Sequence, residues 1–149
     1  MKSLYTEADI NEIIDRINKL SPDSQRQWGK MEVPQMFAHC NAALETAAGK
    51  NFPKRFFIGR LISPFTRASF LSEKIFGKNY PTDPSYTFTG QLIFADEIAK
   101  VVSTIQDFHD AGMAKCSSHP HPFYGKLKPN EWGIAMYKHF DHHLRQFGV

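Results

Sequence analysis

The sequence predicts an all-α protein: an antiparallel four-helix bundle with a long crossover between its second and third long helices. Four segments repeat apolar residues at three- and four-residue steps, the spacing that gives a helix one buried stripe. No alternation of apolar and polar residues is long enough to build a sheet. The chain has 149 residues, of which 42% are hydrophobic. We therefore expect a single domain over residues 1–149 with a core of its own.

The first long helix is expected to run from about residue 7 to Leu20. Its apolar residues recur at helical spacing; they are Ile10, Ile13, Ile14, Ile17 and Leu20. Thr6-Glu7-Ala8-Asp9 resembles a capping box at its start. Pro22 ends it, because proline cannot continue the ladder of helical hydrogen bonds.

The second helix is expected from about Val33 to Ala48, with Gly49 closing it. His39 lies three residues after Met36 and four before Ala43, so it faces the interior or its border. A single histidine on an apolar face is more often a core residue than a ligand, so both readings stay open for His39. Cys40 points about 100° away from His39 and is expected to be a small buried hydrophobe.

Residues 50–90 form the least regular part of the chain. A short helix, interrupted or restarted at Ser63-Pro64, is suggested by Phe56, Phe57, Leu61, Ile62 and Phe65. The segment 79–84 has turn chemistry. From Lys50 to Tyr80 there are seven basic residues and one acid. Such a segment could bind an anionic substrate, an acidic partner or a membrane surface. The simpler interpretation, which we favour, is a solvated cationic face that covers an apolar one.

A third long helix is expected from about Gln91 to His109, followed by a proline-stiffened loop at 119–125. The last helix is expected over 130–149, with Pro129 in the first turn and Gly148 at its end. His139 and His143 lie four residues apart with His142 between them. Their Cβ atoms are then about 5–6 Å apart, close enough to hold one metal ion. The alternative is a histidine-rich surface turn or satisfied core histidines.

Composition excludes several classes of function. The formal net charge of +3 is too small to indicate nucleic-acid binding, and we expect none. No apolar run reaches the ~20 residues of a membrane span, and the N-terminus lacks the apolar centre of a signal peptide. The two cysteines form no CxxC pair. We therefore expect no disulfide framework, no membrane insertion and a cytoplasmic location.

Over nearly its whole length the chain resembles the DinB/YfiT-like family of metalloenzymes. The resemblance depends on Met36-Phe37-Ala38-His39 and on His139-Phe140-Asp141-His142-His143-Leu144-Arg145-Gln146. It is closer to a DinB-like subgroup of unassigned activity, which has an HPFFG-type loop. Here that loop reads His121-Pro122-Phe123-Tyr124-Gly125, and the subgroup's following helix motif reads Trp132-Gly133 and Tyr137-Lys138-His139. In one departure, Lys128 stands where a Ser or Thr cap is expected.

The resemblance implies a four-helix bundle that binds one divalent metal ion through three histidines. Carried over by position, they are His39, His139 and His143, whereas His142 matches an intervening residue that is not the usual ligand. The metal would be zinc or nickel, less often manganese. Characterised relatives include thiol-dependent S-transferases and a hydrolase, which implies a small-molecule substrate and, for transfer, a low-molecular-weight thiol. The oligomeric state, monomer or homodimer, is left open.

Three neutral imidazoles leave a fourth ligand position open for water or substrate. Such a centre can lower the pKa of bound water to about 7 or hold a thiol as its thiolate. The sequence thus supports three hypotheses: a hydrolase or thiol S-transferase, a bundle that the metal only stabilises, and a binding module that uses the basic segment 50–80.

Other residues could assist this centre. His121 could act as a general base and Tyr124 could orient the substrate, if their loop folds over the metal. The competing interpretation is that the loop only packs Phe123 on the core. Glu45 and Gln35, one turn from His39 on either side, are the candidates for orienting its ring. Asp141 is expected to face solvent.

Overall fold

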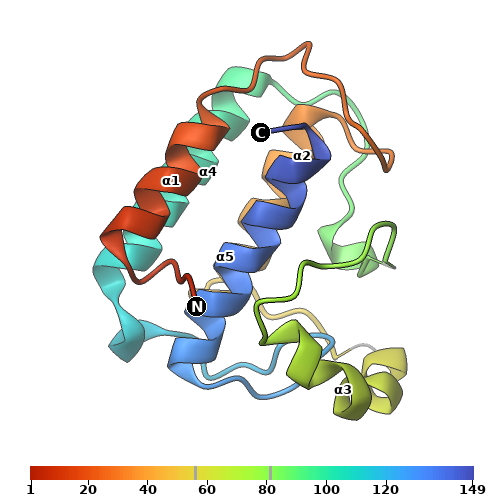
Figure 1. Ribbon diagram of the computed structural model, residues 1–149, viewed down its shortest axis with the longest axis vertical. Helices are drawn as coiled ribbons and strands as arrows, with labels where there is room; N and C mark the ends of the chain where they lie inside the picture. Colours follow the sequence, from red (N-terminus) through yellow and green to blue (C-terminus); the bar gives the residue numbers. More distant parts are fainter. Residues whose placement is uncertain (56, 81) are drawn as a thin grey trace.

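The computed structural model describes residues 1–55, 57–80 and 82–149, and within them the chain is all-helical (Figure 1). Its helices are α1 (Glu7–Ile17), α2 (Val33–Ala47), α3 (Phe57–Phe70), α4 (Phe94–Ala111) and α5 (Pro129–Gln146), with 3₁₀ turns η1 (Pro84–Tyr86) and η2 (Met113–Lys115). No strand occurs in the described ranges, and one isolated bridge joins His121 to Gly125. The predicted all-α class is therefore confirmed. Phe56 and Pro81, expected in a helix and a turn, lie outside the described residues.

The four long helices pack in a ring of contacts: α1 and α2 each contact both α4 and α5. α1 and α5 run in the same direction, because Leu4 donates to the Gly133 carbonyl near their starts and Arg16 contacts Asp141 near their ends. α2 and α4 are also parallel (Figure 1). Only α1 with α4 and α2 with α5 are antiparallel, so the expected antiparallel order holds for two of the four contacting pairs.

The crossover from 48 to 93 makes α2 and α4 parallel, because the chain runs back along the length of α2 before α4 begins. At the end of α2, Lys50 lies 3.5 Å from Asp107 of α4. At the start of α2, the amide of Gln35 lies 3.3 Å from the carbonyl of Gly90, just before α4. The chain therefore returns to the end where α2 begins before it starts α4. The predicted long crossover is confirmed.

α2 is the most enclosed helix. Thirteen of its 15 residues are buried, including Ala38, Cys40 and Ala42 on different sides. α4 and α5 cover part of its surface, and η1 of the crossover covers another part. Because only Gln35 and Glu45 of this helix are partly exposed, the single inward stripe expected from the sequence understates its burial. Cys40, fully buried, is the small hydrophobe that was predicted, and burial raises the pKa of its thiol.

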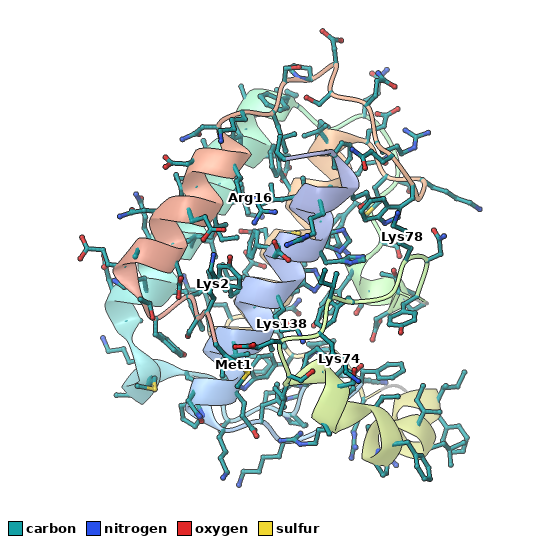
Figure 2. The ribbon with its side chains drawn as sticks, in the orientation of Figure 1. Met1, Lys2, Arg16, Lys74, Lys78 and Lys138 are labelled. Atoms are coloured by element: carbon teal, nitrogen blue, oxygen red, sulfur yellow. The ribbon has the colours of Figure 1, made fainter. Side chains whose placement is uncertain are left out.

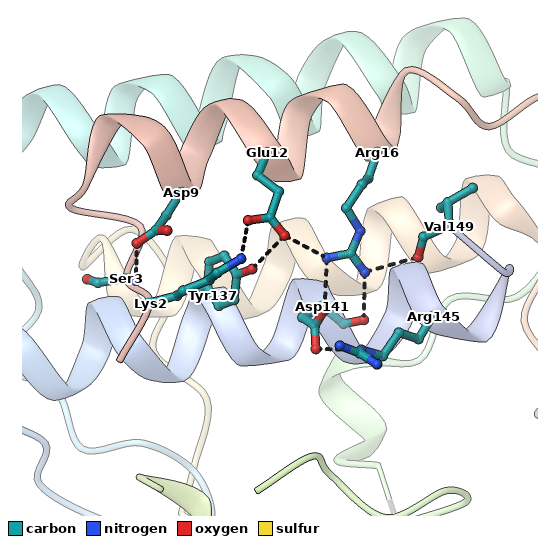
Figure 3. A network of polar contacts seen from close by, with 9 residues as sticks. All are labelled: Lys2, Ser3, Asp9, Glu12, Arg16, Tyr137, Asp141, Arg145 and Val149. Atoms are coloured by element: carbon teal, nitrogen blue, oxygen red, sulfur yellow. Dashed lines mark hydrogen bonds and ion pairs between the residues drawn. The ribbon is translucent and has the colours of Figure 1, made fainter. Parts of the chain in front are cut away.

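Between α1 and α5 lies a network of polar contacts centred on Arg16 (Figure 3). Its guanidinium donates to Asp141 Oδ1 at 2.8 Å and to the carbonyl of Val149 at 3.0 Å. Asp141 also accepts from Arg145 at 2.8 Å, and Tyr137 donates to Glu12 at 3.0 Å. The side chain of Asp141 is only 17% exposed. The expectation that it faces solvent is wrong, because α1 lies along that side of α5.

Three local expectations about the helices are corrected. α1 ends at Ile17 rather than Leu20. Its capping box is absent, because the Asp9 carboxylate accepts from the backbone of Ser3 and the side chain of Thr6 makes no cap bond. α3 continues through Pro64, which costs it one intrahelical hydrogen bond but does not interrupt it.

α3 also contradicts the favoured interpretation of the basic segment. Its buried residues are Gly59, Ser63 and Phe70, whereas Phe65 is 84% and Phe57 is 70% exposed. Apart from Phe70 at its end, the large apolar side chains of α3 therefore face outward, and the small residues Gly59 and Ser63 face the protein. Gly59 is required there, because a Cβ on it would lie 2.7 Å from the carbonyl oxygen of Phe123.

Candidate metal centre

His39 of α2 and His139 and His143 of α5 meet inside the bundle. Each offers one nitrogen, and these nitrogens all lie within 4.8 Å of one another, so the three residues could hold a metal ion. The ring centroids of His39 lie 4.8 Å from His139 and 4.7 Å from His143. The i, i+4 spacing on α5 accounts for one pair. The antiparallel packing of α2 on α5 brings the third ring to them.

His39 is held by the crossover. It is 3% exposed, and its Nδ1 lies 2.9 Å from the carbonyl oxygen of Tyr86. A carbonyl can only accept, so Nδ1 carries the proton and Nε2 keeps its lone pair for a ligand. Tyr86 is itself anchored, because its hydroxyl lies 2.8 Å from Oγ1 of Thr46, which donates to the Ala42 carbonyl.

His143 is held from its own helix. Its Nδ1 lies 2.9 Å from Oε1 of Gln146, and the amide nitrogen of Gln146 donates to the carbonyl of Trp28 at 2.7 Å. Because the Trp28 carbonyl can only accept, it fixes the orientation of the amide, and Oε1 must accept from His143. Nε2 of His143 is therefore also left unprotonated. A partner that fixes the tautomer and the ring orientation is a common feature of metal-binding histidines.

His139 completes the centre with an unsatisfied atom. Its Nε2 is buried and has no hydrogen-bond partner among the described residues. A buried polar atom without a partner costs about 1–3 kcal/mol, so its presence needs an explanation. Burial lowers the pKa of His139 well below its usual value, and the neighbouring His143 and His39 lower it further.

The other two imidazoles are also neutral. Burial lowers the pKa of His39, and burial, followed by the nearness of the titratable His39 ring, lowers the pKa of His143 to about 3. Neutral imidazole is the form that binds a metal ion. The centre thus presents three neutral nitrogen donors and no anionic one within the described chain.

His142 lies outside this cluster, as the resemblance implies. Its ring is packed between Trp28 and Phe76, with both centroids 5.9 Å away, and it lies 5.0 Å from the ring of His143. It lines a surface cavity of about 420 Å³ together with those two aromatic residues, Lys78 and other residues. The expectation that His142 is not one of the three clustered nitrogens agrees with this position.

The loop with His121 and Tyr124 folds onto the bundle beside α3. Nδ1 of His121 accepts from the backbone N–H groups of Phe123 and Tyr124, at 3.0 and 3.2 Å. Burial lowers the pKa of His121 to about 3. Tyr124 stacks on Phe70 with centroids 3.8 Å apart. Both residues therefore have structural contacts within their loop and α3, and neither belongs to the three-histidine cluster.

The predicted orienting groups for His39 are wrong. Glu45 accepts from Asn41 at 2.9 Å, and Gln35 accepts from the backbone of Glu32 at 3.0 Å. Tyr86 and Gln146 hold the rings instead, and both were missed. The i, i+3 spacing from His143 could have identified Gln146. Nothing local could have identified Tyr86, because its contribution is a backbone carbonyl 47 residues from His39.

Comparison with known proteins gives one match. A family model described as "Protein of unknown function (DUF1569)" matches residues 2–148. Comparison with the curated proteins finds no match, and neither does comparison with the solved structures. Among the described residues, no helix combines the length and apolar character that crossing a bilayer requires.

Proposed function

We infer that this chain, which belongs to the DUF1569 family of proteins of unknown function, is a divalent-metal-dependent enzyme acting on a small molecule. DUF1569 is a DinB/YfiT-like family. The reaction we propose is hydrolysis or thiol S-transfer. One observation carries the proposal: three neutral imidazoles converge, and the buried Nε2 of His139 has no partner in the described chain.

The donor set fits a zinc or nickel ion. Both ions bind imidazole nitrogen, and a site with three histidines keeps a further position for water or substrate, as catalytic zinc sites do. The ion's chemistry at such a centre would be that of a Lewis acid toward a water or a thiol. An ion would also satisfy Nε2 of His139, to which no described residue gives a hydrogen bond.

The chain's own residues would hold and orient this centre. Tyr86 keeps the proton of His39 on Nδ1, and Gln146 keeps that of His143 on Nδ1, so both Nε2 atoms stay available. His121 cannot accept a proton at Nδ1, which already accepts two backbone N–H groups. In the proposal it therefore keeps its proton on Nε2 and acts, with Tyr124, in shaping the loop beside the site.

A second function is a metal-stabilised bundle without catalysis. The three ligands come from α2 and α5, so an ion would link two helices distant in sequence. That alone would stabilise the fold by mass action, whether or not a substrate binds. Turnover of a substrate by the metal-loaded protein would distinguish an enzyme from a bundle that the metal only stabilises.

The test is metal analysis of protein purified without a histidine tag. We expect about one equivalent of zinc or nickel in the wild type and a large loss in His39→Ala and His143→Ala. His142→Ala is the matched control, because it removes an adjacent imidazole outside the cluster. Unchanged metal content in both ligand variants would overturn the site. If metal binds, a metabolite screen with and without small thiols follows, and absence of any turnover that depends on His143 would favour the structural role.

A further inference from the structure

α3 is amphipathic, but its apolar face points away from the protein, whereas a surface helix normally packs its apolar face on the core. Taking Phe57 as the origin and 100° per residue, its exposed apolar residues fall within about 140° of the helix circumference. They are Phe57, Ile58, Leu61, Ile62 and Phe65, each between 39% and 84% exposed. Gly59 and Ser63, at about 200° and 240°, face the protein. Figure 1 shows α3 set apart from the four long helices.

This orientation is fixed by contacts on the opposite side of α3. Arg67 donates to the carbonyl of Tyr124 at 3.1 Å and to the carboxylate of Glu131 at 2.7 Å. At the C-terminal end of α3, the ammonium of Lys138 donates to the Phe70 carbonyl at 2.7 Å. Figure 2 shows where Lys138 lies on α5. A cation at that end of α3 also suits the negative end of the helix dipole. α3 is therefore held with its apolar face outward, and rotation to bury that face would break these bonds.

Basic residues surround the apolar face. Lys54 and Arg55 lie three and two residues before the start of α3, and Arg60 lies about 60° from Phe57 around the helix. Lys54, Arg55, Arg60 and Lys74 are all exposed. The loop that contacts α3 adds two exposed lysines, Lys126 and Lys128. From Lys50 to Tyr80 a single acid, Glu73, opposes them.

We propose that α3 is a membrane-docking helix, which inserts its apolar face into the interface of an anionic lipid bilayer. An apolar face flanked by Lys and Arg is the pattern of helices that lie in the plane of a membrane surface. The apolar side chains would leave water for the acyl boundary, and the basic rim would contact the lipid headgroups. No helix needs to cross the bilayer for this binding.

The positive charge around the apolar face of α3 favours a lipid surface over a second copy of the chain as the binding partner of that face. Two copies that met through α3 would bring the same cations, Lys54, Arg55 and Arg60, toward each other. Like charges across an interface oppose association. An anionic bilayer supplies the opposite charge and an apolar layer at once.

The experiment is co-sedimentation of the full chain with vesicles. One set contains phosphatidylcholine alone and the other contains about one third phosphatidylserine. We expect binding to the anionic vesicles that weakens as salt is raised. Leu61→Asp and Phe65→Asp should each reduce binding about tenfold or more, because the inserted side chain becomes charged. Ile93→Asp is the matched control, since Ile93 is 66% exposed and lies outside α3.

The contribution of the basic residues around the apolar face is tested with Lys54→Gln and Arg60→Gln, each expected to weaken vesicle binding about fivefold. The control is Lys19→Gln, which removes an exposed lysine just after the end of α1. His143→Ala should bind vesicles like the wild type, so failure of the metal centre and failure of docking are distinguishable. Equal binding to both vesicle sets, or none to either, would overturn the proposal. So would a concentration-dependent dimer in solution that Leu61→Asp dissociates, because a second copy would then cover the face.

Discussion

Oε1 of Gln146 lies 2.9 Å from Nδ1 of His143, and this one contact determines which nitrogen of that imidazole is free for a ligand. The amide is oriented in turn by the Trp28 carbonyl, 2.7 Å from Nε2 of Gln146. A segment between α1 and α2 therefore helps to set the chemistry of a residue on α5.

Gln146→Leu should weaken metal binding about 10–100-fold, because the ring of His143 loses the acceptor that fixes its tautomer. Isothermal titration of metal-free protein measures the affinity. Gln35→Leu is the matched control: it removes a glutamine that caps α2 and does not touch the cluster. An equal loss of affinity in both variants would show that general destabilisation, and not the contact with His143, is responsible.

Gly29→Ala should disturb the same contact from the other side. Gly29 has φ +78°, and a Cβ there would clash with Nε2 of Gln146. We expect a loss of more than about 1 kcal/mol in unfolding free energy together with weaker metal binding. Gly49→Ala separates the two effects, because Gly49 also has positive φ (+72°) but its Cβ would meet nothing closer than 3.7 Å. It should lose stability and keep its metal affinity.

Asp141→Ala should lower the free energy of unfolding by about 1–3 kcal/mol, because Arg16, whose side chain is 13% exposed, would lose the nearer of its two carboxylate partners and keep only Glu12 at 3.6 Å. Chemical denaturation measures this loss. The comparison is Asp107→Ala, which removes the exposed ion pair with Lys50 and should cost less than about 1 kcal/mol. Metal content should not change in either variant. Similar losses in the two would mean that the network between α1 and α5 contributes little.

His121 should make the fold sensitive to acid. Burial lowers its pKa to about 3 in the folded state, whereas an unfolded histidine titrates near 6.5. Between these values the unfolded state binds more protons, so stability should fall as pH drops below 6.5, by at most about 1.4 kcal/mol per pH unit for this residue. His121→Asn keeps an acceptor for the loop and removes the titration. The stability difference between wild type and variant should therefore shift in the variant's favour as pH falls, and a constant difference would contradict the assignment.

Much of the fold could be predicted from local patterns. The periodicity that predicted a helix from about Val33 to Ala48 matches α2, which spans Val33–Ala47, within one residue. The start of α5 at Pro129 was equally well marked. The start of α1 near residue 7 was also predicted correctly, but its capping, its end at Ile17 and the continuity of α3 were not. Asp9 bonds Ser3 and Lys138 holds the end of α3, and neither contact follows from helical periodicity.

The sequence by itself determined the helices and the pairing of His139 with His143, because both depend on spacing along one chain segment. Only the tertiary structure decided that His39 joins them, that Tyr86 and Gln146 hold the rings, and that α3 turns its apolar face outward. These features depend on the path of the crossover and on how whole helices pack. Many individually weak contacts across the chain set that packing, and no local spacing encodes it.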